Sequence, residues 1–442
     1  MSSPFEFSPV KLVYGGEALG HYQGRAVLAP RVLPGERAQV EETRTAKGVV
    51  HARPLRILEA APERAEAPCP YFGGCGGCQY QHLDAARQAV AKREILRETL
   101  RRLGKISWEG EIPLHTGPPW NYRNQARVKV ACQPDGKLAL GFFEAESRRL
   151  FPVDACLILS PHLNAILGEL GGSDWSPRLC ACREIELLAD ERDERVMLTL
   201  HSSLALKEGE ELARDCLRRL PGVISLAIER RRNRQVFGEA VLIYHVNEFR
   251  YQISPGAFFQ SSRFLLPELV AAVTDIAPAG GTAGADPGSS GRRKLALDLF
   301  AGVGLFTLPL AKRFDQVVSV EAHPQASADL RANARAQAMR NVRPVTGTVF
   351  DFLRRCTQPE PDLVVLDPPR EGVGIATLKL LIALRPKRLH YVSCSPPTLA
   401  RDLGFLASHG YRLISIELFD LFPQTYHIES LARLTRMSPP GP

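Results

Sequence analysis

Apolar runs of strand length alternate with amphipathic stretches of helical period along the chain after about residue 256. A run that is apolar at every position suits a strand buried on both faces, and an amphipathic stretch suits a helix packed on a sheet. The pattern therefore predicts an α/β domain with a parallel, doubly wound sheet. We expect strands at 295–300, 317–321, 362–367, 389–394 and 411–419, and helices at 304–313, 324–338, 375–384 and 397–408.

Shorter alternating runs, separated by Gly and Pro, fill the first sixty residues: VKLVYGG, GRAVLAP, AQVEETR and KGVVHARPLRILE. Several short strands at this spacing favour a small β-barrel. A helix is expected at about 84–103, and the mixed α+β pattern of 122–247 includes helices at 161–170 and 208–219. We expect three domains: a barrel at 1–62, a central domain from 63–82 and 113–255, and the doubly wound domain from 83–112 and 256–442.

The composition excludes two classes of protein. Apolar residues are 45% of the 442 residues, too large a share for a mainly disordered chain. No run approaches the roughly 18 consecutive apolar residues of a membrane span. The N-terminus, MSSPFEFSPVKLVYGG, lacks the charged start and apolar run of a secretory signal, so we expect a cytoplasmic protein.

The net charge of +8 favours a polyanionic partner. Basic residues are dense at 87–102 (RQAVAKREILRETLRR) and at 230–234 (RRRNR). An ordinary solvated surface explains either stretch equally well, so both interpretations stay open. The ten cysteines of a cytoplasmic chain are not expected to form disulfides. Cys69, Cys75 and Cys78 are close together in CPYFGGCGGCQYQ, which is typical of a metal or cluster site.

A strand, a Gly-bearing turn and a helix start are recognisable in LALDLFAGVGLFTLPLA, residues 295–311. Asp298 lies at the end of the strand, and Gly302 and Gly304 allow the backbone to approach a ligand closely. The third glycine of the dinucleotide fingerprint is missing. The segment instead looks like the first motif of S-adenosylmethionine-dependent methyltransferases. Glu321 ends the next strand, where a carboxylate accepts hydrogen bonds from ribose hydroxyls; the alternative is a generic turn with a solvated Glu.

Three further residues are expected at the same edge of the sheet. Asp367 follows an apolar strand in DLVVLDPPREGV, and Cys394 follows another in LHYVSCSPPTLARDL. A thiol in such an open polar turn suits covalent catalysis, although a buried structural role is the commonest fate of a free Cys. Glu429 lies just before the last apolar strand, after a loop that holds His427, and a carboxylate there suits a general base.

Together these residues resemble the RNA uracil-carbon-5 methyltransferases, over nearly the whole chain. The resemblance implies a Rossmann-like methyltransferase domain, an N-terminal OB-like barrel (a TRAM domain) that binds RNA, and a central domain that carries a 4Fe–4S cluster. It implies that the cluster ligands are Cys69, Cys75, Cys78 and Cys156, that S-adenosylmethionine is held by Gln260, Phe300, Gly302, Glu321 and Asp367, and that Cys394 is the nucleophile and Glu429 the base. The cysteines expected not to be ligands are Cys132, Cys180, Cys182, Cys216 and Cys356.

Two residues depart from the family pattern: Ser262 replaces the Asn after the Gln motif, and Leu305 replaces the Asn that often follows Gly-x-Gly in ribosomal members. Thr348 occupies a position that often contacts the adenine side of the cofactor. The expected reaction is methylation of a uridine in RNA, with 23S ribosomal RNA favoured over tRNA, by a monomer with no membrane partner. Methylation of an amino group is disfavoured because Arg370, rather than an aromatic residue, follows Asp-Pro-Pro. A non-catalytic iron–sulfur protein is disfavoured because Cys394 and Glu429 are both present.

Overall fold

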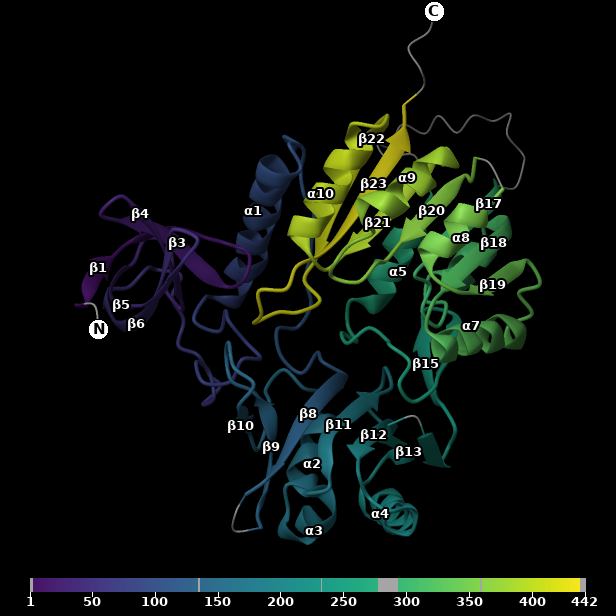
Figure 1. The fold of residues 1–442 in the computed structure, drawn as a ribbon, viewed down its shortest axis with the longest axis horizontal. Coiled ribbons are helices and arrows are strands. Elements are labelled where there is room, and N and C mark those ends of the chain that lie inside the picture. Colours follow the sequence, from purple (N-terminus) through teal and green to yellow (C-terminus); the bar gives the residue numbers. More distant parts are fainter. Residues whose placement is uncertain (1–2, 134–135, 232, 277–292, 358–359, 438–442) are drawn as a thin grey trace, which may run out of the picture.

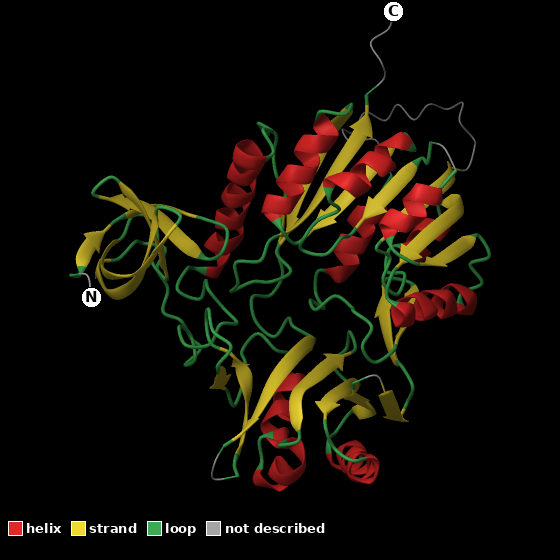
Figure 2. Cartoon of the chain, viewed as in Figure 1, coloured by secondary structure: helices red, strands yellow, loops and turns green. Residues whose placement is uncertain are grey.

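The computed structural model describes residues 3–133, 136–231, 233–276, 293–357 and 360–437. Within these ranges the chain forms three larger sheets and a two-stranded hairpin. Figure 1 shows the N-terminal sheet (purple) at the left, the central sheet (blue to teal) below, and the C-terminal sheet (green to yellow) at the upper right. Figure 2 shows that loops connect the three parts where they approach one another.

The N-terminal sheet has six strands in the order β1-β5-β6-β4-β3-β2. They are β1 (Phe5–Phe7), β2 (Pro9–Leu12), β3 (Glu17–Tyr22), β4 (Arg25–Pro30), β5 (Arg37–Ala46) and β6 (Val49–Glu59). All neighbours are antiparallel except β4 and β6, and Phe7, Val27 and Val40 point into a buried core. Strands are therefore present where the alternating pattern predicts them, and the OB-like barrel itself stays a prediction.

The central sheet has seven strands in the order β10-β9-β8-β11-β12-β13-β14. They are β8 (Gln125–Cys132), β9 (Leu138–Phe143), β10 (Leu150–Pro152), β11 (Cys182–Ala189), β12 (Val196–Ser202), β13 (Val223–Arg230) and β14 (Asn233–Gly238). Its apolar face packs against α2 (Pro161–Leu170) and α4 (Leu206–Arg219), close to the two predicted helices. A 3-10 turn (Ser173–Trp175) and α3 (Ser176–Leu179) lie between β10 and β11 in the sequence. The crossover through α4 makes β12 and β13 parallel.

The C-terminal sheet has eight strands in the order β19-β18-β17-β20-β21-β23-β22-β7. They are β7 (Leu114–His115), β17 (Arg293–Leu299), β18 (Phe314–Glu321), β19 (Val342–Thr346), β20 (Leu363–Leu366), β21 (Arg388–Ser393), β22 (Tyr411–Phe419) and β23 (Glu429–Arg436). The predicted parallel arrangement holds for β17 to β21. β23 is antiparallel to both β21 and β22, because it follows β22 through a short loop.

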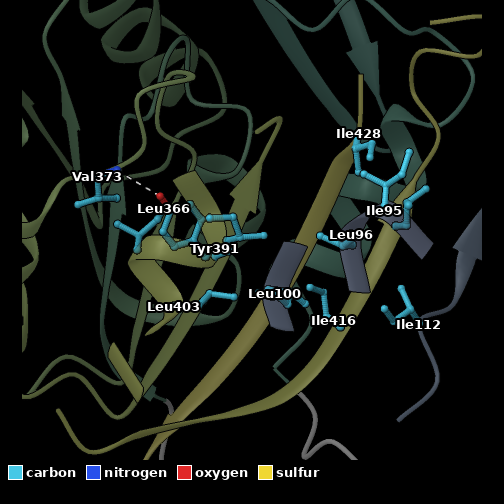
Figure 3. Close-up of a cluster of buried hydrophobic side chains, with 14 of the residues drawn as sticks. Ile95, Leu96, Leu100, Ile112, Leu366, Val373, Tyr391, Leu403, Ile416 and Ile428 are labelled. Carbon is cyan, nitrogen blue, oxygen red and sulfur yellow. Dashed lines mark hydrogen bonds between the residues drawn. The ribbon is translucent and has the colours of Figure 1, made fainter. Parts of the chain in front are cut away.

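Helices cover both faces of this sheet, as the doubly wound pattern predicts. One core packs the sheet against α1 (Ala85–Leu103), α8 (Val349–Arg355), α9 (Ile375–Ala383) and α10 (Pro396–Ala407). The other packs it against α5 (Leu266–Thr274), α6 (Thr307–Ala311), α7 (Pro324–Ala336) and the hairpin of β15 (Leu242–Val246) and β16 (Phe249–Ile253). Figure 3 shows Leu96 and Leu100 of α1 beside Ile416 of β22, which joins a helix from early in the chain to the last strands.

Leu114 and His115 form β7 and pair with β22 of the C-terminal sheet, and the predicted domain bounds stay a prediction. The expectation of no disulfides is wrong for Cys132 and Cys180, which are bonded to each other. Cys132 ends β8, and Cys180 lies just before the neighbouring β11, so that their Cα atoms are 5.1 Å apart.

In the described part of the chain, no helix has the length and apolarity to cross a membrane.

Candidate active site

The carboxyl ends of β17, β20 and β21 meet at one edge of the C-terminal sheet, and the strand order reverses at β17 and β20. Ligands of doubly wound sheets bind at such a switch point. Gly302 lies in the turn after β17, Asp367 directly follows β20, and Cys394 directly follows β21. The structure therefore brings three residues of the predicted site to one edge.

Glu321 ties the end of β18 to the turn after β17. Its carboxylate oxygens accept hydrogen bonds from the backbone N–H groups of Gly302 at 2.8 Å and His323 at 2.6 Å. Gly302 has a φ of +55°, and a Cβ there would meet nothing within 4 Å, so the turn has open space beside it. Phe300 also has a positive φ, +67°, which is uncommon for a residue with a side chain and is found often at functional sites. These features fit a nucleoside ligand such as S-adenosylmethionine.

Two buried carboxyl groups lie under this turn. Burial raises the pKa of Asp298 to about 7 and that of Asp367 to about 7, with Asp298 a second cause for Asp367. Asp298 Oδ2 accepts a hydrogen bond from the Thr307 hydroxyl at 2.5 Å. Asp298 Oδ1 is buried and has no partner among the described residues. An acceptor left open in this way fits a ligand that brings its own hydrogen-bond donor.

Cys394 and Glu429 lie next to each other because of the β21–β23 register. Ser393, the last residue of β21, pairs with Ser430 of the antiparallel strand β23. Cys394, which follows Ser393, and Glu429, which precedes Ser430, therefore lie at the same edge of the sheet. Burial raises the pKa of the Cys394 thiol to about 12, and the carboxylates of Glu429 and Asp367 add to this rise. Burial also raises the pKa of Glu429 well above its usual value, with Asp367 a second cause. A thiol, a buried carboxyl group and Asp367 thus form one electrostatically connected group.

Arg370 acts on the thiol through its charge and contacts His427. Arg370 Nη2 is 3.2 Å from Nε2 and 3.3 Å from Nδ1 of His427. The positive charge of Arg370 lowers the pKa of Cys394 and so opposes the effect of burial. Burial, and then Arg370, lower the pKa of His427 to about 3, which leaves its ring neutral. The sequence drew attention to both residues, but it carried no sign that they meet.

The remaining predicted cofactor contacts are placed as follows. Gln260 is buried, whereas Phe258, two residues earlier, exposes 65% of its surface. Ser262 forms an isolated antiparallel bridge with Arg123, and the backbone of Ser261 accepts a hydrogen bond from Asn124. The cofactor roles of Gln260, Phe300, Gly302, Glu321 and Asp367 stay predictions.

Leu305, a departure from the family pattern, and Thr348, a position that often contacts the cofactor in the family, both have structural roles. Leu305 is buried in the core that α6 shares with the hairpin, and its carbonyl accepts a hydrogen bond from the Tyr251 hydroxyl at 2.9 Å. Thr348 caps α8, since its hydroxyl accepts a hydrogen bond from the backbone N–H of Asp351. Each side chain is therefore accounted for by local structure.

A second candidate site lies between the segment before α1 and the loop that follows β10. The predicted cluster ligands Cys69, Cys75, Cys78 and Cys156 line one pocket. Apolar side chains, including Phe142, Val153 and Ile158, complete most of its wall. The backbone N–H of Gly77 donates a hydrogen bond to Cys75 Sγ at 3.4 Å. Four thiols around one apolar pocket, with an N–H group directed at sulfur, fit the ligand set of a 4Fe–4S cluster.

Basic side chains gather between β2 and the end of α1. Lys11, Arg101, Arg102 and Lys105 line one groove together with Glu98 and Leu103. We call this surface the basic groove. The stretch at 230–234 is different, because Arg234 donates to the carbonyl of Pro255 and to Glu229, and Arg230 donates to Gln235. The basic groove also contains ion pairs, since Glu98 pairs with Lys11 and lies 3.6 Å from Arg102.

A group of possible metal ligands, Glu184, Glu186 and His201, lies on β11 and β12. Glu184 is paired with Lys129, and Glu186 lies 3.2 Å from Arg127. Since the carboxylates already have cationic partners, we assign no metal to this group.

The sequence is similar to those of known RNA methyltransferases. The sequence profile of the tRNA (Uracil-5-)-methyltransferase family matches residues 247–437. A "23S rRNA (uracil(1939)-C(5))-methyltransferase RlmD" from Alkalilimnicola ehrlichii is 34% identical, and the match covers 98% of this chain and 97% of the relative. An "Uncharacterized RNA methyltransferase" from Aquifex aeolicus is 32% identical over 98% of each chain.

The fold also matches a solved structure over nearly the whole chain. It is the crystal structure of Pyrococcus abyssi tRNA (uracil-54, C5)-methyltransferase in complex with S-adenosyl-L-homocysteine. The match has a TM-score of 0.74 at 21% identity and covers 98% of this chain and 100% of that chain. At this identity the likeness establishes the methyltransferase fold.

Proposed function

This chain belongs to the family of RNA uracil-C5 methyltransferases, and on that premise we propose that it methylates carbon 5 of a uridine in 23S ribosomal RNA. The observation that carries the proposal is the meeting of Cys394, Glu429 and Asp367 at the ligand-binding edge of the sheet. We place S-adenosylmethionine at the turn after β17, held by Phe300, Gly302 and Glu321, with Gln260 and Asp367 as further contacts. The open space beside Gly302 supports this placement.

The proposed chemistry follows from the reactivity of uracil. Carbon 5 is a poor nucleophile, but addition of the Cys394 thiolate to carbon 6 turns the ring into an enolate whose carbon 5 is reactive. S-adenosylmethionine, when bound, supplies the methyl group. Glu429 then takes the proton from carbon 5, the double bond re-forms, and the thiolate leaves carbon 6. His427 is a poor candidate for this base because its pKa is lowered to about 3.

The 4Fe–4S cluster belongs to the same proposal. Cys69, Cys75, Cys78 and Cys156 are the proposed ligands, since they line one pocket. The proposed reaction transfers no electrons, so the cluster has a structural role.

RNA reaches the site through the basic groove and the N-terminal sheet. The target uracil must leave its stack to reach the thiol. The groove supplies four cations and one carboxylate, a balance that favours contacts with phosphates. The choice of 23S ribosomal RNA rests on the relative with that name at 34% identity, and tRNA is the alternative because of the matching tRNA enzyme structure.

Two variants test the proposed roles. Cys394→Ala should abolish both methyl transfer and covalent RNA adducts. Glu429→Gln should still allow attack and methylation but block release, so that a methylated covalent RNA complex accumulates as a slow, heat-stable band in a denaturing gel. Turnover should fall by about 10²–10⁴-fold or more. RNA with 5-fluorouridine at the target should trap the wild-type enzyme in the same way, because fluorine cannot leave as a proton does.

The control is Cys356→Ala, which changes a free cysteine at the end of α8. It should keep full activity and adduct formation. An active Cys394→Ala enzyme would refute the mechanism, whereas an inactive Glu429→Gln enzyme without adduct would refute only the role of the base. Running 23S ribosomal RNA and tRNA transcripts in parallel decides between the two substrates.

A further inference from the structure

The turn between β2 and β3 of the N-terminal sheet reaches the nucleophile. The Tyr14 hydroxyl donates a hydrogen bond to the backbone carbonyl of Cys394 at 3.4 Å, across 380 residues of sequence. Burial raises the pKa of Tyr14 to about 12, so its hydroxyl keeps its proton near neutral pH and remains a donor. Cys394 comes before Ser395, the N-cap of α10, so its carbonyl lies outside the hydrogen bonds of that helix. The Tyr14 bond therefore acts on a part of the turn that the helix does not hold.

Aromatic contacts continue from Tyr14 to the loop that carries the catalytic edge. The ring of Tyr426 meets Tyr14 edge-on, with centroids 5.5 Å apart. Tyr426 also contacts His427, with centroids 4.4 Å apart, and His427 lies beside Arg370. Because Glu429 follows two residues later, the N-terminal turn contacts both the residue that attacks and the loop that leads to the base.

Close packing at Gly16 keeps this turn in place. Gly16 has a φ of +89°, and a Cβ there would lie 2.9 Å from the Cβ of Gln79 and 3.5 Å from the Cβ of Tyr426. The Gln79 side chain accepts a hydrogen bond from the backbone N–H of Tyr426 at 3.3 Å. The backbone N–H of Gln79 donates to the carbonyl of Gln424 at 2.9 Å. Gln79 directly follows Cys78, so the cysteine segment joins the same contact.

We propose that Tyr14 is a positioning residue of the active site, whose hydroxyl holds the turn that presents the Cys394 thiol to uracil. The N-terminal sheet then completes the active site in addition to binding RNA. The proposal rests on the proposed function, because it presumes that Cys394 attacks carbon 6. A hydroxyl that fixes the turn restricts the conformations of the Cys394 side chain before the thiol attacks. Its loss should therefore change the rate constant of attack more than the affinity for RNA.

The first experiment compares Tyr14→Phe with wild type on a 23S ribosomal RNA transcript made with 5-fluorouridine. The rate of covalent adduct formation at saturating RNA should fall about 5- to 10-fold, the effect expected from losing one hydrogen bond. The dissociation constants for RNA and for S-adenosylhomocysteine should stay within about twofold, because the aromatic ring remains. Tyr22→Phe is the matched control, since Tyr22 lies on the same sheet and stacks on Phe5, at a centroid distance of 4.1 Å.

A second pair of variants tests the packing without touching Tyr14. Gly16→Ala should displace the turn from Gln79 and lower the same rate constant. Gly15→Ala is the control, because Gly15 also has a positive φ, +113°, but a Cβ there would meet nothing within 4 Å. Both variants carry a backbone penalty, so only their difference reports the contact with Gln79.

The outcomes separate this inference from the proposed function. If wild type forms no adduct with either RNA class, the proposed function fails. If wild type forms the adduct and Tyr14→Phe forms it equally fast, the inference fails. A loss of RNA affinity with an unchanged rate constant, or an equal effect in Tyr22→Phe, would also overturn it. A slower adduct rate in Tyr14→Phe alone, with unchanged affinities, supports it.

Discussion

Opposing neighbours set the reactivity of Cys394. Burial raises the pKa of its thiol, the carboxylates of Glu429 and Asp367 raise it further, and the Arg370 guanidinium lowers it. The thiolate is the form that attacks. Since the thiol pKa of about 12 lies above neutral pH, the thiolate fraction grows as pH rises. Arg370 is thus the cation that opposes the effect of burial on this thiol.

We expect two pH effects from this arrangement. The rate of adduct formation by wild type should rise with pH between roughly pH 6 and 9, by at most about tenfold per pH unit. The pH stays below the thiol pKa, and ionisation of Asp367 near its pKa of about 7 raises the thiol pKa and so flattens the rise. Arg370→Gln should raise the thiol pKa further and slow adduct formation by about tenfold at neutral pH. Both effects are measured by quenching the reaction at a series of times and quantifying the fluorouridine adduct on denaturing gels. Arg385→Gln removes an exposed cation elsewhere and should leave the profile unchanged; a flat wild-type profile would contradict the prediction.

At the scale of elements, α1 holds the loop between β22 and β23. The Lys92 ammonium is fully buried, pairs with Asp420 at 2.6 Å and donates to the carbonyl of Phe422 at 2.9 Å. Gln88 exchanges hydrogen bonds with Gln424 in the same loop. Leu96 and Leu100 of α1 continue the contact into the apolar core (Figure 3). The helix therefore fixes the loop that ends at Glu429.

Breaking the buried Lys92–Asp420 ion pair should strongly lower the free energy of unfolding. Lys92→Met leaves the Asp420 carboxylate buried and unpaired, which should lower the free energy of unfolding by about 3–5 kcal/mol. Urea denaturation measures the change. Replacing both partners, in Lys92→Met with Asp420→Leu, should recover most of the loss, because no charge is then left unpaired.

The control for Lys92→Met is Arg93→Met, which removes a cation from the same helix. Arg93 pairs with Glu94 at the surface, and such pairs contribute at most about 1 kcal/mol. Equal losses in Lys92→Met and Arg93→Met would show that the buried pair has no special weight.

At the scale of the whole molecule, RNA affinity should depend on the basic groove. Changing Arg101, Arg102 and Lys105 to Gln should weaken RNA binding and make it less dependent on salt. Each lost phosphate contact reduces the slope of log affinity against log salt by about 0.7, so three contacts should reduce it by about 2. Filter binding across a salt series gives the slope. The matched control changes Lys207, Arg214 and Arg218 of α4 to Gln, which removes the same charge from another surface.

The cluster should be present in every folded molecule. Protein purified without oxygen should contain about four iron atoms and four sulfides per chain. Cys78→Ser should lose most of the iron, whereas Cys356→Ser should keep it, because Cys356 lies outside the pocket. Iron and sulfide analysis decides the point, and a wild-type protein free of iron would refute the assignment.

Local patterns in the sequence were enough to predict much of the molecule. The apolar runs predicted β17, β18, β20, β21 and β22 to within a few residues, because a buried strand must be apolar along its own length. The Gly-bearing turn after Asp298 and the acidic end of the next strand were visible for the same reason: both requirements lie within one short segment. Cys69, Cys75 and Cys78 were visible because their spacing is local.

Contacts between distant segments were decided only by the tertiary structure. The Cys132–Cys180 bond depends on the pairing of β8 with β11, and the place of Leu114 and His115 depends on the free edge of β22. Tyr14 meets Cys394 only because the N-terminal turn packs against Gln79 and the loop before Glu429. No periodicity records such contacts, since each depends on the register and packing of elements that lie far apart in the chain. The sequence by itself therefore determined which residues could do the chemistry, and the packing of distant elements decided which of them meet.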